Sequence, residues 1–551
     1  MFSMYSCHSH MTQKGIEHIF HGTELDSDSL KSTFICAKNV WNDCKWSTEY
    51  DDTIFLQYVL PPQVADEPIE YYWREDIPER VNIVYQTEAI SDLAHKLNST
   101  VEVDTRPESW RNGQMGYTHT ISGAFGKCDD RTILAAMTMR SYGIPAAFDF
   151  VPLWGSGNNG HSFCSVILPD NSLLVFQDRN DDGITYKFSH KTAKIYRRTF
   201  FEDHNSLIYR QQANEPIPPF FLDHRMKDVT SLHKIGSQDI DVSIKTETEN
   251  RIGYLGIFHP TGWHPIAYSE IHDTSIRFSS VGNGLDINGE PALKGEDIGD
   301  GILYLPFIYT GEVTPIGDPF ILSRNGIRTL CASSETEDII LHRKFPRLSR
   351  ISRFAGYMSG GIIEGANNAD FSDAIPLHHI YGTPASHLQR IRLSDNQPFR
   401  YIRYRKPSGT FSIAELRVFD ENGETIKGAP ISNGLLSQKE YINVIYDNNP
   451  LTYFEISPVL DLWVGLDLGI SQKVSEVAFC PRTDDNDITP GDIYELFYWK
   501  EGWKSLGQKK ATDHTIKFRK VPKGALLWLR NRTKGKEERP FTYENRKQIW
   551  W

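Results

Sequence analysis

The segment that decides the fold is GKCDDRTILAAMTMRSYGIPAAFDFVPLWGSGNNGHSFCSVILPDNSLLVFQD, residues Gly126–Asp178. Two aspartates follow Cys128, apolar residues then recur at helical spacing, and the stretch closes with Gly143 and Pro145. Acidic residues in a first turn, with Gly and then Pro beyond the last turn, are typical helix boundaries. The pattern predicts a helix from about Asp129 to Tyr142.

Cys128 is expected at the N-terminus of this helix. Unpaired N–H groups and the positive end of the helix dipole favour a thiolate there, and the thiolate is the nucleophilic form of cysteine. A lone cysteine is more often a small buried residue. The catalytic interpretation therefore depends on the rest of the segment.

Three short strands are predicted after the helix, with turn residues between the second and third: Ala146–Pro152, His161–Leu168 and Leu173–Asp178. If Leu168 faces Leu173 in a hairpin, His161 faces Asn180. Side chains two residues apart share one face of a strand. This register predicts that His161 and Asp178 are diagonal neighbours on one face.

A carboxylate beside an imidazole fixes the tautomer and stabilises the imidazolium that forms when the ring accepts a thiol proton. The segment thus offers a nucleophile in Cys128, a general base in His161 and an orienting group in Asp178. Docking of the helix end against the hairpin is not visible in the sequence.

The segment resembles the catalytic core of the transglutaminase-like superfamily of cysteine enzymes. The shared features are G-x-C at Cys128, R-S-Y-G-I-P at Arg140–Pro145, D-F-V-P-L-W at Asp149–Trp154, G-H-S-F at His161 and an aspartate 17 residues beyond that histidine. The resemblance implies a papain-like fold with Cys128, His161 and Asp178 as the triad. Phe163 stands where the family usually has Trp, which is a conservative change.

The oxyanion donor is left open. The backbone N–H of Cys128 is a natural candidate. Gln114 and Trp110 lie upstream, but neither side chain can be assigned to this role.

Several other motifs are set aside. Gly155, Gly157 and Gly160 spell G-x-G-x-x-G, but they connect two strands and do not open a helix, so a nucleotide site is not expected. Cys164 is expected to be a buried strand residue. The oxygen-rich loop Thr483–Asp492 lacks the spacing of an EF-hand and is expected to be a turn-rich connection. No third ligand accompanies the histidine pairs, and no metal or cofactor is expected: His378 with His379, and His259 with His264.

Composition bounds the remaining possibilities. The 551 residues indicate three or four domains, because single cores stop growing near about 250–300 residues. A formal net charge of −12, from 59 Lys and Arg against 71 Asp and Glu, argues against a general nucleic-acid or anionic-membrane binder. The seven cysteines contain no C-x-x-C pair, which argues against a zinc site or a disulfide scaffold. No run of 18 apolar residues predicts a membrane span.

The chain becomes strand-like from about residue 226, with Pro-rich Asn214–Asp228 and the stretch Asp370–Leu388 as expected linkers.

The last 160 or so residues resemble a discoidin-like (coagulation factor type C) module. The resemblance rests on RYIRYRKPSGTFSIAELRVFDENG (Arg400–Gly423), YDNNPLTYFE (Tyr446–Glu455) and WVGLDLG (Trp463–Gly469). The resemblance implies a jelly-roll sandwich with a possible carbohydrate ligand. Aromatic residues that stack on sugars are also common in strand cores, and here they are Tyr498, Trp499, Trp503, Trp528, Trp550 and Trp551.

The expected fold class is α+β, with a papain- or transglutaminase-like catalytic core followed by two β-sandwich domains. The expected ranges are 1–95 for a mostly helical and extended region, 96–215 for the catalytic core, 226–375 for one β-sandwich and 388–551 for the discoidin-like one. The layout is similar to multidomain bacterial proteins, which implies an extracytoplasmic location, periplasmic or at the cell surface. The first residues, MFSMYSCHSHMTQKG, lack a secretory signal; either the protein is cytoplasmic or the numbered chain lacks its natural start.

The leading hypothesis is a cysteine enzyme that cleaves or transfers acyl groups at amide bonds through a thioester on Cys128. Its substrate would be a peptide, a glycopeptide or cell-wall material, with an accessory glycan-binding module. Water is favoured over an amine as acceptor because no acceptor-amine site is recognisable. The alternative is a non-catalytic peptide- or glycan-binding surface protein on the same scaffold. A third hypothesis, amide cleavage of the peptide N-glycanase kind, rests on analogy alone.

Overall fold

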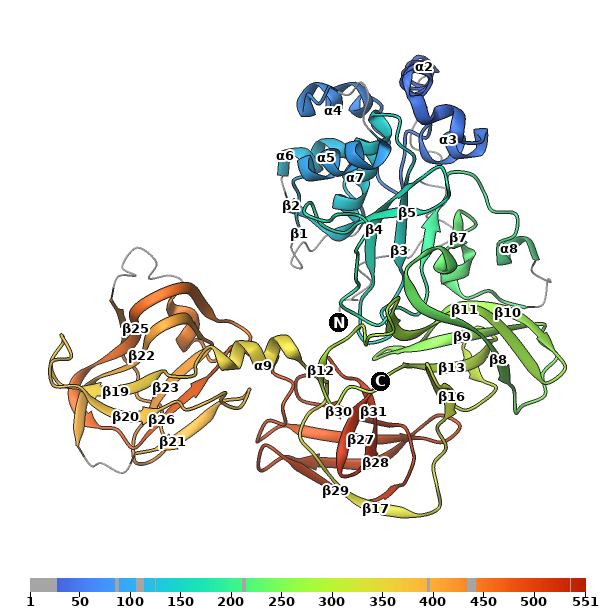
Figure 1. Cartoon of the computed structure of the whole chain (residues 1–551). Helices are drawn as coiled ribbons and strands as arrows, with labels where there is room; N and C mark the ends of the chain where they lie inside the picture. Colours follow the sequence, from blue (N-terminus) through green and yellow to red (C-terminus); the bar gives the residue numbers. More distant parts are fainter. Residues whose placement is uncertain are drawn as a thin grey trace.

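The computed structural model describes residues 27–84, 89–105, 113–123, 125–210, 215–393, 397–433, 442–535 and 537–551. Figure 1 shows a core of helices and a sheet, followed by three further groups of β-strands. The mixed helix-and-sheet content agrees with the expected α+β class. Among the helices in these ranges, none has the length and apolar character needed to cross a membrane.

The core combines helices with a five-stranded antiparallel sheet that has the order β5-β4-β3-β6-β7. The strands are β3 (Ala146–Val151), β4 (His161–Ile167), β5 (Leu173–Phe176), β6 (Tyr196–Arg198) and β7 (Met226–Asp228). The helices are α2 (Ser27–Asp43), α3 (Asp52–Tyr58), α4 (Trp73–Val81), α5 (Ile90–Thr100), α6 (Tyr117–Gly123), α7 (Cys128–Ser141) and the short α8 (Leu207–Arg210). Two short strands, β1 (Asp104–Thr105) and β2 (Phe125–Gly126), pair in parallel.

Helix α7 is the central element of the core. It begins at Cys128 and ends at Ser141, which confirms the helix expected from about Asp129 to Tyr142. All residues from Asp129 to Ser141 are buried. A helix enclosed on every side is not limited to one apolar stripe, so apolar residues of α7 lie on more than one of its faces. The three strands expected after it are also confirmed, within two residues at each end.

The chain direction brings the start of α7, the start of β4 and the end of β5 to one edge of the core. The turn from α7 into β3 is short, and the Ile144 N–H donates to the Met139 carbonyl across it at 3.0 Å. Strand β3 therefore runs back along α7, and β4, which is antiparallel to β3, runs in the same direction as α7. Strand β5 is antiparallel to β4, so its last residues lie beside the first residues of β4.

The predicted register of the β4–β5 hairpin is wrong by one residue. The structure pairs Ile167 with Leu173, and the Leu168 N–H donates to the Ser172 carbonyl at 2.9 Å. The connection is therefore a three-residue loop, with Asn171 in the left-handed conformation at φ 64°, a common hairpin geometry. The sequence had suggested a four-residue loop. In the observed register the position opposite Asp178 is Ser162, and β5 ends at Phe176 before reaching it.

A second group of strands forms one eight-stranded sheet, with β14 paired to β13 beside the path β16-β15-β13-β9-β10-β11-β8. Its apolar cluster includes Leu153 and Ala193 of the core, so the two bodies pack directly together. The strands are β8 (Ile235–Ser243), β9 (Ile252–His259), β10 (Gly262–His272), β11 (Ser275–Asp286), β13 (Ile302–Tyr309), β14 (Val313–Pro315), β15 (Phe320–Ser323) and β16 (Gly326–Thr329).

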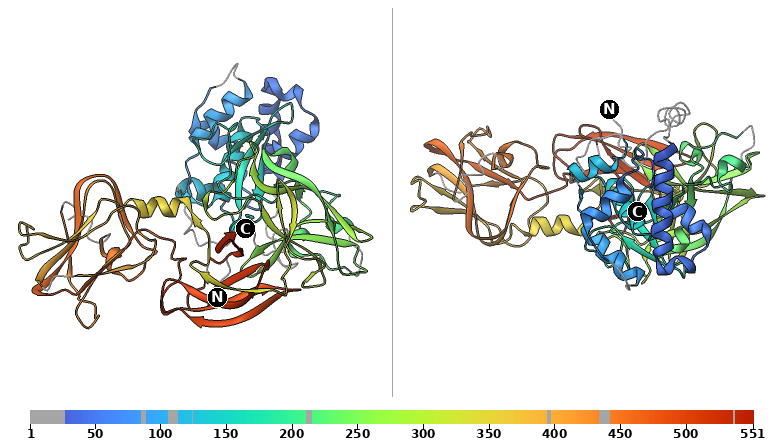
Figure 2. Two further views of the ribbon diagram at one scale, coloured as in Figure 1. Left: turned by 60° about the horizontal axis from the view of Figure 1, so that its bottom comes forward. Right: turned by 90° about the horizontal axis from the view of Figure 1, so that it is seen from above.

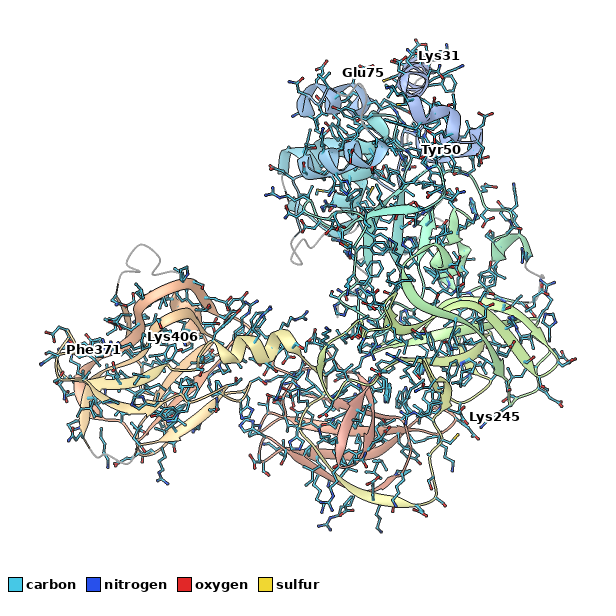
Figure 3. All side chains as sticks on the ribbon, in the orientation of Figure 1. Lys31, Tyr50, Glu75, Lys245, Phe371 and Lys406 are labelled. Atoms are coloured by element: carbon cyan, nitrogen blue, oxygen red, sulfur yellow. The ribbon has the colours of Figure 1, made fainter. Side chains whose placement is uncertain are left out.

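The range 388–551, expected to hold one β-sandwich, contains two separately packed sets of sheets. One set includes strands β19 and β20, which precede residue 388, and it has its own apolar cluster. It comprises β19 (Ile362–Ala366), β20 (Ile375–His379), β21 (Gln389–Arg392), β22 (Pro398–Ile413), β23 (Glu415–Phe419), β24 (Ala429–Ser432), β25 (Phe454–Lys473) and β26 (Glu476–Cys480). Figure 2 shows this body standing apart from the core, with helix α9 (Ser349–Gly356) leading into it; Phe371 and Lys406 mark it in Figure 3.

The other set joins the last strands of the chain to β17, which precedes the detached body in sequence. Strand β17 pairs with β29, so residues 362–480 are an insertion between β17 and the rest of its sheet system. Sequence patterns do not show such long-range pairing. The strands are β17 (Thr336–Leu341), β27 (Ile493–Trp499), β28 (Trp503–Lys510), β29 (Ile516–Pro522), β30 (Leu527–Asn531), β31 (Pro540–Glu544) and β32 (Lys547–Trp550), and nearby β12 (Gly295–Glu296) pairs with β18 (Arg347–Leu348).

The aromatic residues considered for sugar stacking lie largely in interfaces and cores. Trp499, Trp528 and Trp551 are each less than one-tenth exposed, and they belong to one cluster with Phe258 and Trp263 of the second group. Trp550 is buried within the last sheet system. Aromatic faces that are covered in this way do not form a carbohydrate platform. They attach the end of the chain to the second group of strands.

Candidate functional site

Cys128 is the first residue of α7 and is half-buried. Asp130 caps the helix start, because its carboxylate accepts from the backbone N–H groups of Lys127 and Met115, each at 2.8 Å. The thiol therefore lies at a well-ordered helix N-terminus, which is the position expected from the sequence. Helix N-termini favour the thiolate form.

Asp129 is a residue of this site that the sequence did not single out. It is buried, and its Oδ1 accepts hydrogen bonds from the Ser162 hydroxyl at 2.6 Å and from the Cys128 thiol at 3.7 Å. Burial, followed by the nearby Cys128, raises the pKa of Asp129 well above its usual range. The only sequence signal was its place next to the cysteine.

His161 is the first residue of β4 and is half-buried. Its ring stacks on Trp154 with centroids 5.9 Å apart and 26° between the planes, and it lies 6.0 Å from the ring of Phe163. Within the described ranges neither ring nitrogen makes a hydrogen bond. The contacts that the structure gives this ring are therefore aromatic.

Asp178 lies just beyond the end of β5 and is exposed. Its carboxylate accepts from the backbone N–H of Asn180 at 3.4 Å, and its carbonyl accepts from the side-chain amide of Asn98 at 2.9 Å. The other end of Asn98 accepts from the Arg131 guanidinium at 2.9 Å. Arg131 stands one turn into α7, so a two-bond bridge ties Asp178 to the helix that carries Cys128.

The three predicted residues thus come from three elements that meet at one edge of the core. Two links fasten that edge: Asp129 to Ser162, the neighbour of His161, and Arg131 through Asn98 to Asp178. In the described part of the chain, no hydrogen bond joins the side chains of His161 and Asp178. The register from which their diagonal placement was inferred is shifted by one residue, and the pairing of His161 with Asp178 stays a prediction.

The candidates for oxyanion stabilisation fare differently. The side-chain oxygen of Gln114 accepts from the Asp66 backbone N–H at 2.8 Å, so it is engaged in holding another loop. Trp110 lies outside the described residues. The Cys128 backbone N–H stays a prediction.

The carboxylates of the oxygen-rich loop at 483–492 are held by basic side chains. Arg343 makes two hydrogen bonds to Asp484, at 2.8 and 2.7 Å, and also binds Asp487. Lys534 contacts Asp485 at 3.0 Å. Cations already neutralise the loop, and the described residues contain no group of three or more side chains placed to hold a metal ion. Cys164 is fully buried, which raises its pKa to about 12, as expected for a structural thiol.

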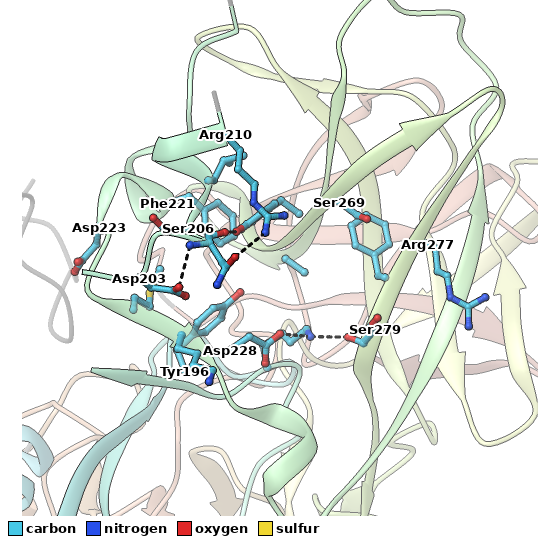
Figure 4. A pocket seen from close by; sticks show the side chains of 18 residues that line it. Tyr196, Asp203, Ser206, Arg210, Phe221, Asp223, Asp228, Ser269, Arg277 and Ser279 are labelled. Carbon is cyan, nitrogen blue, oxygen red and sulfur yellow. Dashed lines mark hydrogen bonds and ion pairs between the residues drawn. The ribbon is translucent and has the colours of Figure 1, made fainter. Parts of the chain in front are cut away.

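A cleft of about 340 Å³ lies elsewhere, between β6, β7 and α8 of the core and strands β10 and β11 of the second group (Figure 4). Lys194 in its wall is paired with Asp228 at 2.5 Å and donates to the Ser279 carbonyl. Its lining includes no residue of α7, β4 or β5. The cleft is therefore separate from the edge that carries Cys128.

Comparison with known proteins gives weak likenesses only. No protein-family model matches the chain, and no curated protein matches it. Among solved structures, LapG of Legionella pneumophila aligns with 26% of this chain and 74% of its own length at 14% identity and a TM-score of 0.16. Its calcium-bound form covers 28% and 82%, with a TM-score of 0.18. Red sea bream transglutaminase covers 88% of this chain and 77% of its own at 8% identity and a TM-score of 0.22. These scores are too low to carry an argument about the site.

Proposed function

We propose that this chain is a cysteine-dependent amide hydrolase or acyltransferase with Cys128 as nucleophile, His161 as general base and Asp178 as orienting group. The supporting observation is the shared edge: the N-terminus of α7, the start of β4 and the end of β5 meet there, fastened by the Asp129–Ser162 bond and the Arg131–Asn98–Asp178 bridge. Both links act on residues at or next to the three proposed groups.

The reaction begins when His161 accepts the thiol proton and the Cys128 sulfur attacks the carbonyl carbon of an amide. The C–N bond then breaks, the amine leaves with the proton returned by the imidazolium, and a thioester remains on Cys128. Water or a second amine attacks the thioester and gives its proton to His161, the C–S bond breaks, and the acid or the new amide is released. The Cys128 sulfur regains its proton from His161. Burial, followed by the nearby Cys128, raises the pKa of Asp129, which disfavours a second negative charge beside the sulfur.

The proposed substrate is an amide bond in a peptide or glycopeptide, and the proposed location is extracytoplasmic. Water is the proposed acceptor, because it is always available and no amine site is recognisable among the described residues around Cys128. Free access to the edge supports a large substrate, since Asp178 is exposed and both Cys128 and His161 are only half-buried.

A second candidate is a non-catalytic binding protein on the same scaffold. It is favoured by one observation: the Asp178 carboxylate accepts from the Asn180 backbone and does not contact the His161 ring. A site without an Asp178–His161 hydrogen bond would keep the same fold and the same arrangement of α7, β4 and β5 but would not activate the Cys128 thiol.

Thiol alkylation decides between the two. Each cysteine is labelled with iodoacetamide across pH 5–9, and the labelled sites are identified by peptide mapping. The labelling rate of Cys128 should rise at a pH well below about 8.5, the pKa of an ordinary thiol. Cys331 is the internal control, because it is exposed and its hydrogen bond to the Asp318 carboxylate raises its pKa. His161→Ala should shift the Cys128 profile toward that of an ordinary thiol. If wild-type Cys128 behaves as an ordinary thiol, the binding protein is the better description.

Turnover is then tested with a peptide library, with and without an added primary amine. Release of acid alone identifies a hydrolase, and incorporation of the amine identifies a transferase. Cys128→Ala must abolish both products.

A further inference from the structure

The loop Pro152–Gly160 leads directly into His161 and is held in a fixed shape. The Trp154 N–H donates to the Asn159 carbonyl at 2.9 Å, which closes the loop on itself. The Gly155 N–H donates to the Lys191 carbonyl at 2.7 Å, and the Lys191 N–H donates to the Ser156 hydroxyl at 3.0 Å. At Gly160 an added Cβ would lie 2.3 Å from the Val151 carbonyl oxygen, so the chain folds back too tightly for any side chain.

Arg539, nearly 400 residues away in sequence, binds this loop from the last sheet system. Its guanidinium donates to the carbonyls of Gly155 and Gly157, the latter at 3.0 Å. It also donates to the carbonyls of Phe258 at 3.0 Å and Trp551 at 3.1 Å. The Arg539 side chain therefore connects three parts of the molecule: the loop before His161, the second group of strands, and Trp551, which follows β32.

Arg539 is fully buried, and three of its four partners are the backbone carbonyls of Gly155, Gly157 and Phe258. The fourth is the main-chain oxygen of Trp551, the last residue of the sequence. Burial lowers the pKa of Arg539 to about 9. A guanidinium with several fixed donors is suited to hold several carbonyls in one arrangement.

The loop in turn sets the orientation of His161. Trp154, inside the loop, stacks on the His161 ring at 5.9 Å and on the His190 ring at 5.4 Å. Since no hydrogen bond within the described ranges fixes the His161 ring, its packing on Trp154 and Phe163 restrains it. A shift of the loop would therefore move the imidazole relative to the start of α7.

We propose that Arg539 is a positioning residue for His161, so that the last sheet system forms part of the catalytic apparatus. The inference rests on the proposed function, because it assumes that His161 activates Cys128. Arg539 acts through the Gly155–Gly157 backbone and Trp154, and it touches no reacting atom.

The test is the pH profile of Cys128 alkylation by iodoacetamide in Arg539→Met, Arg539→Lys and the wild type. Arg539→Met should lower the rate at pH 7 by about tenfold to a hundredfold and move the profile toward that of an ordinary thiol, since small displacements of a catalytic group have effects of this size. Arg539→Lys keeps the charge with fewer donors and should restore part of the rate. Arg530→Met is the matched control: Arg530 lies on β30, pairs with Glu538 and makes no contact with the loop.

The outcomes separate the two proposals. An ordinary-thiol profile in the wild type overturns the proposed function and this inference with it. A shifted wild-type profile that Arg539→Met retains, with the variant folded by circular dichroism, overturns the role of Arg539 alone. Equal losses in Arg539→Met and Arg530→Met also overturn it, because they would reflect general loosening of the last sheets.

Arg539→Met removes several buried hydrogen bonds, so a gentler pair of variants provides a second test. Arg539→Lys and Trp154→Phe are measured singly and together. If Arg539 acts through Trp154, the double variant should lose little more than the stronger single variant. Fully multiplicative losses in the alkylation rate would show that the two residues act independently and would contradict the proposal.

Discussion

The core sheet carries two aspartate–histidine pairs in opposite settings. Asp149 on β3 and His233 are both fully enclosed, with the His233 Nε2 3.0 Å from the Asp149 carboxylate. Arg197 makes two further hydrogen bonds to Asp149, at 2.7 and 2.8 Å, and these partners hold the pKa of Asp149 far below its usual range. The other His233 nitrogen contacts the Tyr186 hydroxyl at 3.2 Å.

The second pair, Asp178 and His161, lies at the open edge beside Cys128. Its members are exposed and half-buried, and no hydrogen bond joins them in the described chain. Judged by hydrogen bonding alone, Asp149 and His233 form the better dyad. Yet every donor and acceptor of the Asp149–His233 pair has an internal partner, and no surface is left for a substrate. Of the two pairs, Asp178–His161 is the one with a thiol at a helix N-terminus nearby. Complete satisfaction of polar groups indicates a structural role.

The largest expected effect separates the two pairs by activity. Cys128→Ala removes the nucleophile and should reduce any acyl-transfer activity by about 10³-fold or more, with little change in the unfolding midpoint because the residue is only half-buried. Activity is measured with the peptide library and stability by chemical denaturation. Cys331→Ala, at an exposed thiol, is the control. Activity that survives in Cys128→Ala would remove the open edge from consideration.

Next in size is Asp178→Asn, which should lower activity by about 10²-fold or more, since an orienting carboxylate supports the imidazolium in the transition state. The free energy of unfolding should change by less than about 1 kcal/mol, because the side chain is exposed. The bridge to Asn98 uses the backbone carbonyl, which the substitution retains. A stability loss larger than the activity loss would assign Asp178 to the same structural class as Asp149.

Asp149→Asn should show the reverse pattern. It leaves Arg197 as an uncompensated buried charge, and breaking such a pair typically costs about 3–5 kcal/mol. The variant is assessed by the denaturation midpoint and, at a temperature where it stays folded, by the Cys128 alkylation profile. Because the folded-state pKa of Asp149 is depressed, its stabilisation is present above the unfolded pKa of about 3.9 and is lost as the pH falls below it. An unchanged acid-unfolding midpoint in Asp149→Asn would contradict this role.

The sequence predicted the local elements of the core because their signals are local. Helix α7 and strands β3, β4 and β5 were found from helix boundaries, strand patterns and turn residues, all within one segment. The register failed by a single residue because Asn171 takes the left-handed conformation and shortens the loop. A shift of one residue in a strand reverses the facing of every side chain, so the predicted register could not establish the pairing of Asp178 with His161.

Long-range features were beyond the sequence for a different reason. The enclosure of Asp149 depends on Arg197 and His233, which are distant in sequence and carry no mutual pattern. The same is true of the pairing of β17 with β29 and of Arg539 with Gly155. Such contacts depend on how separate groups of strands pack together. Sequence motifs therefore identify the candidate catalytic residues but not the distant residues that position them.

The smallest expected effect concerns a buried cation on the open side. Arg197 has a carboxylate partner, whereas the Lys191 ammonium, buried beside the loop that leads to His161, donates to the carbonyls of Gly299 and Gly301 at 2.7 and 2.6 Å. Burial lowers the pKa of Lys191 to about 7. Between that value and the unfolded pKa of about 10.4, the unfolded chain binds a proton that the folded chain does not, so stability should rise with pH. We expect a gain of about 2 kcal/mol between pH 7 and 9 in wild-type protein.

Lys191→Met should remove the rise in stability between pH 7 and 9. The loss of stability at acid pH, which depends on Asp149, should be unchanged. Denaturation midpoints at pH 7, 8 and 9 provide the measurement. Lys194→Met is the matched control, because Lys194 is also buried but is paired with Asp228, and it should keep the wild-type slope. If stability still rises with pH in Lys191→Met, the rise has another source, and the ammonium of wild-type Lys191 stays charged on its two carbonyls. The contrast between a carboxylate-paired and a carbonyl-bound cation in this core would then not hold.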